Sequence, residues 1–128
     1  MHKTRKTTRT VAALLYLATV GIVNTVPEFG LIKRRVLVEV RWLQCLADES
    51  SITELAPLST VMKDVLNGIV DDFSIDDAER VKAIEATTNH DVKAVEYLIR
   101  EKLGDGPETQ PLKDFLHFGC TSEDINNL

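Results

Sequence analysis

Two short polar clusters carry the residue types that could hold an anionic ligand. They occupy residues 87–91 (Thr-Thr-Asn-His-Asp) and 121–127 (Thr-Ser-Glu-Asp-Ile-Asn-Asn), and each stands where a loop is expected to become a helix. The first N–H groups of a helix have no partner inside it, and the helix dipole leaves partial positive charge there. A neighbouring hydroxyl, amide or imidazole can complete a pocket for carboxylate or phosphate. Two such pockets predict a ligand with more than one anionic group.

The elements that must position these clusters read as helices. Apolar residues recur at three- and four-residue spacing and predict helices over about 28–47, 58–72, 74–86 and 92–103, and a short one near 112–116. Gly104 and Pro107 end the fourth of these helices. In the first helix the polar face is expected to carry Lys33, Arg34, Glu39 and Arg41.

Two helix starts are predicted from capping boxes. Ser74 is followed three residues later by Asp77, and Thr121 is followed at the same spacing by Asp124. A hydroxyl at the N-cap and an acid three positions on can satisfy two of the unpaired N–H groups reciprocally. The helix that Thr121 opens reaches the end of the sequence. No segment with strand periodicity competes with these helices.

The amino-acid sequences of the two clusters resemble segments of a known protein family. Residues 87–97 read T-T-N-H-D-V-K-A-V-E-Y and residues 120–128 read C-T-S-E-D-I-N-N-L. Both strings resemble substrate-binding segments of the adenylosuccinate lyases in the fumarase/aspartase superfamily, most like the bacterial and plant type. The likeness extends upstream through residues 28–32 and 38–43 in one register. Two long segments in the same order are far more specific than one short motif.

The resemblance implies an all-α fold, the N-terminal helical domain of that superfamily. It covers residues 27–128, and the chain is expected to stop before the central helical bundle. The family's S-P-L-D-G-R-Y segment, which helps hold the substrate phosphate, has no counterpart in residues 1–26. The segments with the general-acid His and the general-base Ser would follow Leu128. We therefore expect substrate-binding residues but no catalytic residue within this chain, and no turnover by the chain alone.

The resemblance assigns five residues to substrate binding. Asn89, His90 and Asp91 would contact the nucleotide, with His90 donating to phosphate or positioning the reacting group. Thr121 and Ser122 would hold a substrate carboxylate or fumarate. Without the resemblance, the hydroxyls at 121 and 122 are more often simple N-caps.

Several neighbours of these residues have an open or structural interpretation. Asp91 is equally suited to cap the helix it begins, and Asp124 is interpreted as a structural cap. Lys93 and Glu96 could orient the site or form a surface pair. His117 has no role that the resemblance supplies, and we expect it to pack.

The implied reaction is β-elimination of fumarate from adenylosuccinate and from the succinyl-carboxamide ribotide of purine nucleotide biosynthesis. Preorganised donors would stabilise the negative charge that develops on the carboxylate. The family needs no metal or organic cofactor, and it works as a homotetramer. Two alternatives stay open: a non-catalytic module that docks on a full-length lyase, and another superfamily lyase such as argininosuccinate lyase or fumarase.

Charge and cysteine content argue against a nucleic-acid-binding protein, a disulfide-linked protein and a zinc protein. The net charge is −5, but residues 1–26 hold four basic residues and no acid, so the remainder has 11 basic against 20 acidic residues, or −9. Such an acidic body argues against nucleic-acid binding, which relies on clustered Lys and Arg. Cys45 and Cys120 lie far apart and indicate neither a disulfide framework nor a zinc site. Cys120 is expected to pack rather than to act as a nucleophile.

Residues 1–26 form a separate leader with a basic start and an apolar run over 11–23. The run is shorter than the roughly 20 residues that span a bilayer, so a membrane helix is not expected. A secretory signal fits the pattern formally, but an organelle-import leader and a divergent or mis-joined start fit better. The expected location is cytoplasmic, with plastid import as the alternative.

Overall fold

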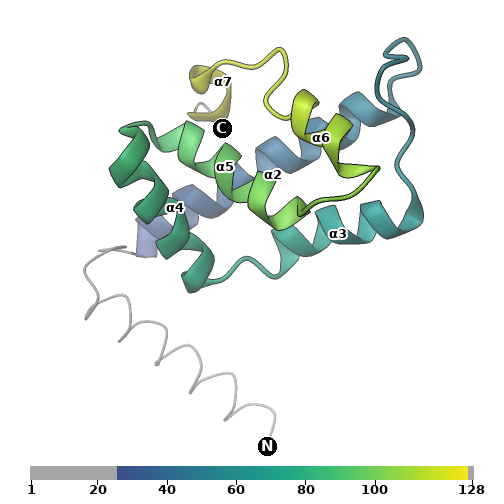
Figure 1. Cartoon of the computed structure of the whole chain (residues 1–128). Helices are drawn as coiled ribbons and strands as arrows, with labels where there is room; N and C mark the ends of the chain where they lie inside the picture. The colour runs from purple at the N-terminus through teal and green to yellow at the C-terminus, as the bar shows by residue number, and fades with distance from the viewer. Residues whose placement is uncertain (1–25, 127–128) are drawn as a thin grey trace, which may run out of the picture.

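The computed structural model describes residues 26–126, which form helices and connecting turns with no β-strand in that range. The all-α prediction is thus confirmed for the described residues. In chain order the helices are α2 (Val26–Asp48), α3 (Thr60–Asp71), α4 (Ile75–Thr88), α5 (Asp91–Leu103), α6 (Thr109–Phe115) and α7 (Ser122–Asn126). Figure 1 shows how they are arranged.

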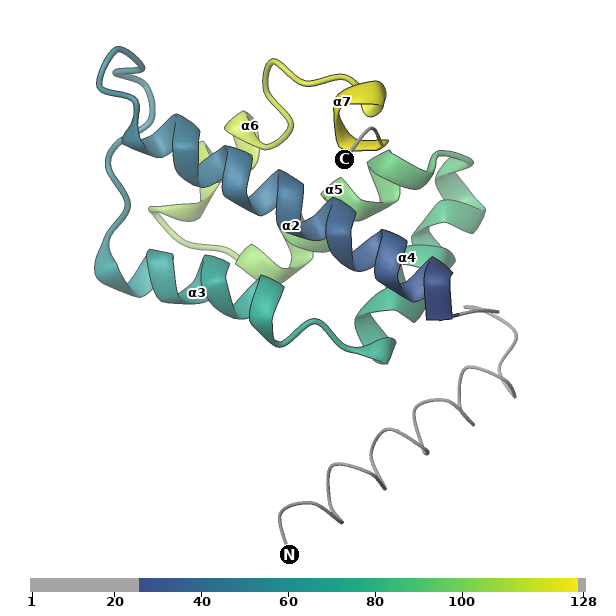
Figure 2. The ribbon, with the colours of Figure 1, turned by 180° about the vertical axis from the view of Figure 1, so that it is seen from behind.

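The long helix α2 is the scaffold on which the other helices pack. Its apolar stripe of Ile32, Val36, Val40 and Leu43 has the spacing of one helix face, and none of these side chains is more than 3% exposed. Figures 1 and 2 show α2 crossing the molecule, with α5 beside it and α3 and α4 flanking it. Both views place α7 beside the corner between α4 and α5, next to the first half of α2. The fold therefore brings the two polar clusters to one side of α2.

Capping residues set the helix starts close to where the sequence predicts them. α3 begins at Thr60 rather than Leu58 because Ser59 is the N-cap, and its Oγ accepts a hydrogen bond from the Met62 N–H at 3.1 Å. The predicted capping box at Ser74 is confirmed. The Ser74 Oγ accepts from the Asp77 N–H at 3.3 Å, and the Asp77 carboxylate accepts from the Ser74 N–H at 3.0 Å.

The capping box gives a first testable prediction. Replacing Ser74 by alanine is expected to lower the free energy of unfolding by about 1 kcal/mol, because the Asp77 N–H loses its acceptor. Ser50 is the matched control, since it is exposed in a turn and has no side-chain hydrogen bond in the described chain. Urea unfolding followed by circular dichroism measures both variants. An equal loss for Ser50→Ala and Ser74→Ala would contradict the capping role.

Several large apolar side chains remain at the surface of the described chain. Trp42 is 37% exposed and Phe118 is 54% exposed, and the Trp42 Nε1–H donates to the Phe118 carbonyl at 2.7 Å. The other exposed large apolar residues are Leu31, Leu37, Val61 and Tyr97. These side chains leave apolar surface exposed on the described domain.

The predicted leader over residues 1–26 falls outside the described residues except for Val26, which begins α2. Among the helices of residues 26–126, none has the length and apolar character needed to cross a membrane.

Candidate functional site

The first cluster forms the corner between α4 and α5. α4 ends at Thr88, and Asn89 follows as its C-cap in the left-handed conformation with φ of 54°. Asparagine enters this region more readily than most residues because its short side chain can hydrogen-bond locally. The Asn89 N–H donates to the Glu85 carbonyl at 2.7 Å, while its side chain is exposed and has no hydrogen bond within residues 26–126. The corner thus presents a free amide to solvent.

His90 is the N-cap of α5. Its Nδ1 accepts a hydrogen bond from the Lys93 N–H at 3.1 Å. This bond uses the lone pair of Nδ1, so the neutral imidazole carries its proton on Nε2. The His90 side chain is 51% exposed. The ring can therefore cap the helix and offer its Nε2–H to an anion at the same time.

The carboxylate of Asp91, the first residue of α5, is engaged on both oxygens. Oδ1 accepts from the Val92 N–H at 2.8 Å, and Oδ2 pairs with the Arg35 guanidinium at 2.8 Å. The sequence left open whether Asp91 binds ligand or caps the helix. The N-cap is His90, and Asp91 instead ties the start of α5 to α2. Ligand contact at this corner is thus better suited to Asn89 and His90 than to Asp91.

The second cluster forms the predicted capping box at the start of α7. The Asp124 carboxylate accepts from the Thr121 N–H at 2.8 Å and from its hydroxyl at 3.2 Å, while the Asp124 N–H donates to the Thr121 Oγ1 at 3.4 Å. Asp124 is therefore the structural cap that was expected. The Ser122 hydroxyl makes no hydrogen bond within residues 26–126, so it is the freer of the two predicted donors.

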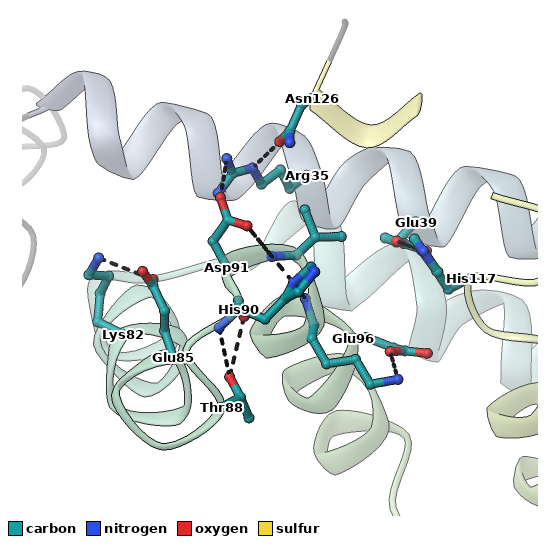
Figure 3. A network of polar contacts seen from close by, with 12 residues as sticks. Arg35, Glu39, Lys82, Glu85, Thr88, His90, Asp91, Glu96, His117 and Asn126 are labelled. Carbon is teal, nitrogen blue, oxygen red and sulfur yellow. Dashed lines mark hydrogen bonds and ion pairs between the residues drawn. The ribbon is translucent and has the colours of Figure 1, made fainter. Parts of the chain in front are cut away.

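Arg35 of α2 joins the two clusters. Its Nη2 lies 2.8 Å from Asp91 Oδ2, and its Nε donates to Asn126 Oδ1 at 3.0 Å. Figure 3 shows the guanidinium between these two side chains. We call these two contacts the Arg35 bridge. In the described part of the chain no hydrogen bond links the clusters to each other directly, so the bridge is their polar connection.

A second polar contact holds the loop before α7. Glu39 is completely buried, and its Oε1 lies 2.5 Å from His117 Nδ1 (Figure 3). The prediction that Glu39 lies on the polar face of the first helix, away from its apolar face, is wrong. It stands three residues after Val36 and four before Leu43, which places it within the apolar stripe of α2. His117 was expected to pack, and it does so as the partner of a buried acid.

Burial shapes the chemistry of Glu39. Loss of solvent raises the pKa of its carboxyl above the ordinary 4.5, and the hydrogen bond from His117 opposes that rise. Glu96 of α5 adds to the rise, because it is a nearby acid, while Lys93 lowers the pKa. The second oxygen of Glu39, Oε2, is buried and has no hydrogen-bond partner in the part of the chain that the structure describes. His117 also has a left-handed backbone with φ of 66°, a conformation that costs free energy for a residue other than glycine.

Lys93 and Glu96 form the pair that the sequence allowed. The Lys93 ammonium lies 2.6 Å from Glu96 Oε2, and the Glu96 residue is only 5% exposed. The same ammonium lies 5.5 Å from the centre of the Tyr97 ring. Lys93 thus neutralises an acid on α5 rather than standing free beside His90.

Cys120 does not have the features of a nucleophile. Burial raises the pKa of its thiol above the ordinary 9.0, and the nearby carboxylates of Glu39 and Asp124 raise it further. A thiol with a raised pKa is protonated at neutral pH and reacts slowly. Nor do residues 26–126 contain a group of three His, Cys, Asp or Glu side chains placed to hold a metal ion. The chemistry that this site supports is anion binding by neutral donors.

Comparison with known proteins gives a consistent result. The family model described as lyase matches residues 28–128. Adenylosuccinate lyase of Haemophilus influenzae is 58% identical over 101 residues, and that of Escherichia coli strain K12 is 54% identical over 101 residues. These alignments cover 79% of this chain and 22% of each relative. Adenylosuccinate lyase of Vibrio cholerae is 49% identical over 109 residues, or 85% of this chain and 24% of the relative. The chain therefore spans about a fifth to a quarter of the length of the curated relatives it matches.

Proposed function

Because the chain belongs to the lyase family whose model matches residues 28–128, we propose that it is part of an adenylosuccinate lyase and binds that enzyme's substrate. The observation that carries the proposal is the Arg35 bridge, which brings the two polar clusters together from separate helices. A substrate with a phosphate and two carboxylates needs donors at more than one place. The two clusters supply them in a chain whose overall charge is negative, so the donors must act locally.

Each cluster has a distinct role in this proposal. The Nε2–H of His90 and the side-chain amide of Asn89 donate to the nucleotide end of the substrate. The Ser122 hydroxyl and the first N–H groups of α7 hold a carboxylate of the succinyl group, with Thr121 supporting them through its capping box. Donors that are fixed in advance favour the charge that builds up on this carboxylate as fumarate leaves. The assembled enzyme would be a homotetramer that also accepts the succinyl-carboxamide ribotide.

A rescue assay tests the proposal. The 128-residue chain is mixed with full-length Escherichia coli adenylosuccinate lyase whose residue equivalent to His90 has been replaced by alanine, and fumarate release is followed by ultraviolet absorbance. We expect the mixture to regain activity, because a competent site segment replaces the defective one. The same chain carrying His90→Ala should give no gain. A mixture that stays inactive, together with no adenylosuccinate binding by the chain alone, would contradict the proposal.

A further inference from the structure

We propose that Arg35 is a positioning residue of this site, which sets the spacing and orientation of the two clusters by binding Asp91 and Asn126 at once. The inference rests on the proposed function for its ligand, but its geometry stands independently. Arg35 lies on α2, Asp91 begins α5, and Asn126 lies in α7. One side chain therefore joins three helices.

The chemistry of the contact requires arginine. The guanidinium is planar and sends N–H groups in fixed, diverging directions, so Nη2 can face one acceptor while Nε faces another. The Arg35 side chain is only 12% exposed, which limits competition from water. A lysine at this position keeps the charge, but its single ammonium cannot reproduce the planar fork.

Both partners of Arg35 are connected to ligand-binding elements. The other oxygen of Asp91 accepts from the Val92 N–H at 2.8 Å, so the carboxylate is fixed to the first turn of α5, directly after His90. Asn126 lies one turn after Ser122 on α7, a short helix that contacts α2 and whose Ile125 is buried. Substituting Arg35 should therefore shift His90 and Ser122 relative to each other. The substitution removes no proposed ligand donor from either cluster.

This role predicts a selective effect on ligands that reach both clusters. Titration calorimetry would compare adenylosuccinate with two fragments that each engage one cluster, AMP and fumarate. In Arg35→Lys we expect the Kd for adenylosuccinate to rise about tenfold, because a two-point ligand depends on the spacing of its sites. The Kd values for AMP and fumarate should stay within about twofold, since each needs one cluster only.

Arg41→Lys is the matched control. Arg41 lies on the same helix and also bridges two side chains, donating at 2.7 Å to Gln44 and to Asn67 of α3, away from both clusters. The Arg41→Lys variant should leave the Kd values for adenylosuccinate, AMP and fumarate unchanged. If Arg35→Lys weakens the fragments as much as adenylosuccinate, Arg35 is a direct ligand or a fold determinant and the positioning role is wrong. If wild-type chain binds none of the three, the proposed function itself fails.

A measurement without ligand tests the positioning role even if the chain binds none of the three ligands. Residual dipolar couplings of backbone N–H groups report the orientation of α7 relative to α5. In Arg35→Lys the couplings of Ser122 to Asn126 should change or shrink relative to wild type, while those of α2 and α5 keep their values. Unchanged α7 couplings would overturn the inference whether or not the chain binds ligand.

Discussion

Replacing His117 by alanine is expected to lower the free energy of unfolding by about 3 to 5 kcal/mol, because it leaves a buried acid without its partner. Glu39 is completely buried, and His117 Nδ1 at 2.5 Å is the hydrogen-bond partner of its carboxylate in the described chain. The second oxygen, Oε2, has no hydrogen-bond partner within residues 26–126, so no second hydrogen bond there would replace the one from His117. Loss of this magnitude is a large part of the stability of a small domain. Urea unfolding at neutral pH measures it.

The double variant Glu39→Met with His117→Leu is the control. It removes the buried acid together with its partner and fills the space with apolar side chains of similar size. Such replacements of buried pairs are often close to neutral. We therefore expect the double variant to recover most of the stability that His117→Ala loses. If His117→Ala alone costs less than 1 kcal/mol, water reaches Glu39 and the buried pair is not the reason for the loop geometry.

Replacing His90 by asparagine is expected to weaken adenylosuccinate binding roughly ten- to hundred-fold, because a hydrogen bond to an anionic group is worth about 1.5 to 3 kcal/mol. In this proposal the two ring nitrogens act separately: Nδ1 caps α5, and Nε2–H, which makes no hydrogen bond within residues 26–126, donates to the ligand. Asparagine is a good N-cap residue, so the helix start should survive. The unfolding free energy should therefore change by less than about 0.5 kcal/mol, which is the usual range for a neutral surface change.

Comparison with His90→Ala sharpens this prediction. The His90→Ala variant should lose the same ligand affinity as His90→Asn. Because alanine cannot cap a helix, His90→Ala should also lose about 1 kcal/mol of unfolding free energy. Calorimetric Kd values and urea unfolding of both variants distinguish the two roles. Full affinity in His90→Asn would show that the imidazole acts only as a cap, and the ligand role would then pass to Asn89 alone.

Local signals in the sequence predicted the helices and their caps well. The capping boxes at Ser74 and Thr121 and the apolar stripe of α2 depend on residues within a few positions of each other, which is the range that periodicity and capping rules describe. The five predicted binding residues lie at helix starts and at one helix end, as expected. Whether they bind substrate stays a prediction.

The sequence could not predict which polar residues connect these segments. Arg35 bonds to Asn126, 91 residues away, and Glu39 bonds to His117, 78 residues away. Both arginine and glutamate are common on exposed helix faces, so their types give no sign of burial. Only the position of Glu39 within the apolar stripe signalled that it faces the core. The role of Asp91 was likewise undecidable until Arg35 was placed beside it.

The central claim is that the two clusters together bind adenylosuccinate. Titration of the ¹⁵N-labelled 128-residue chain with adenylosuccinate, followed by amide chemical shifts, tests it most directly. We predict shifts that saturate with one Kd at residues 89–91 and at 121–122, with little change in the distant groove lined by residues 53–59, 107–108 and 111–112. Saturation of the shifts at only one cluster, shifts confined to the distant groove, or none at millimolar ligand would contradict the account.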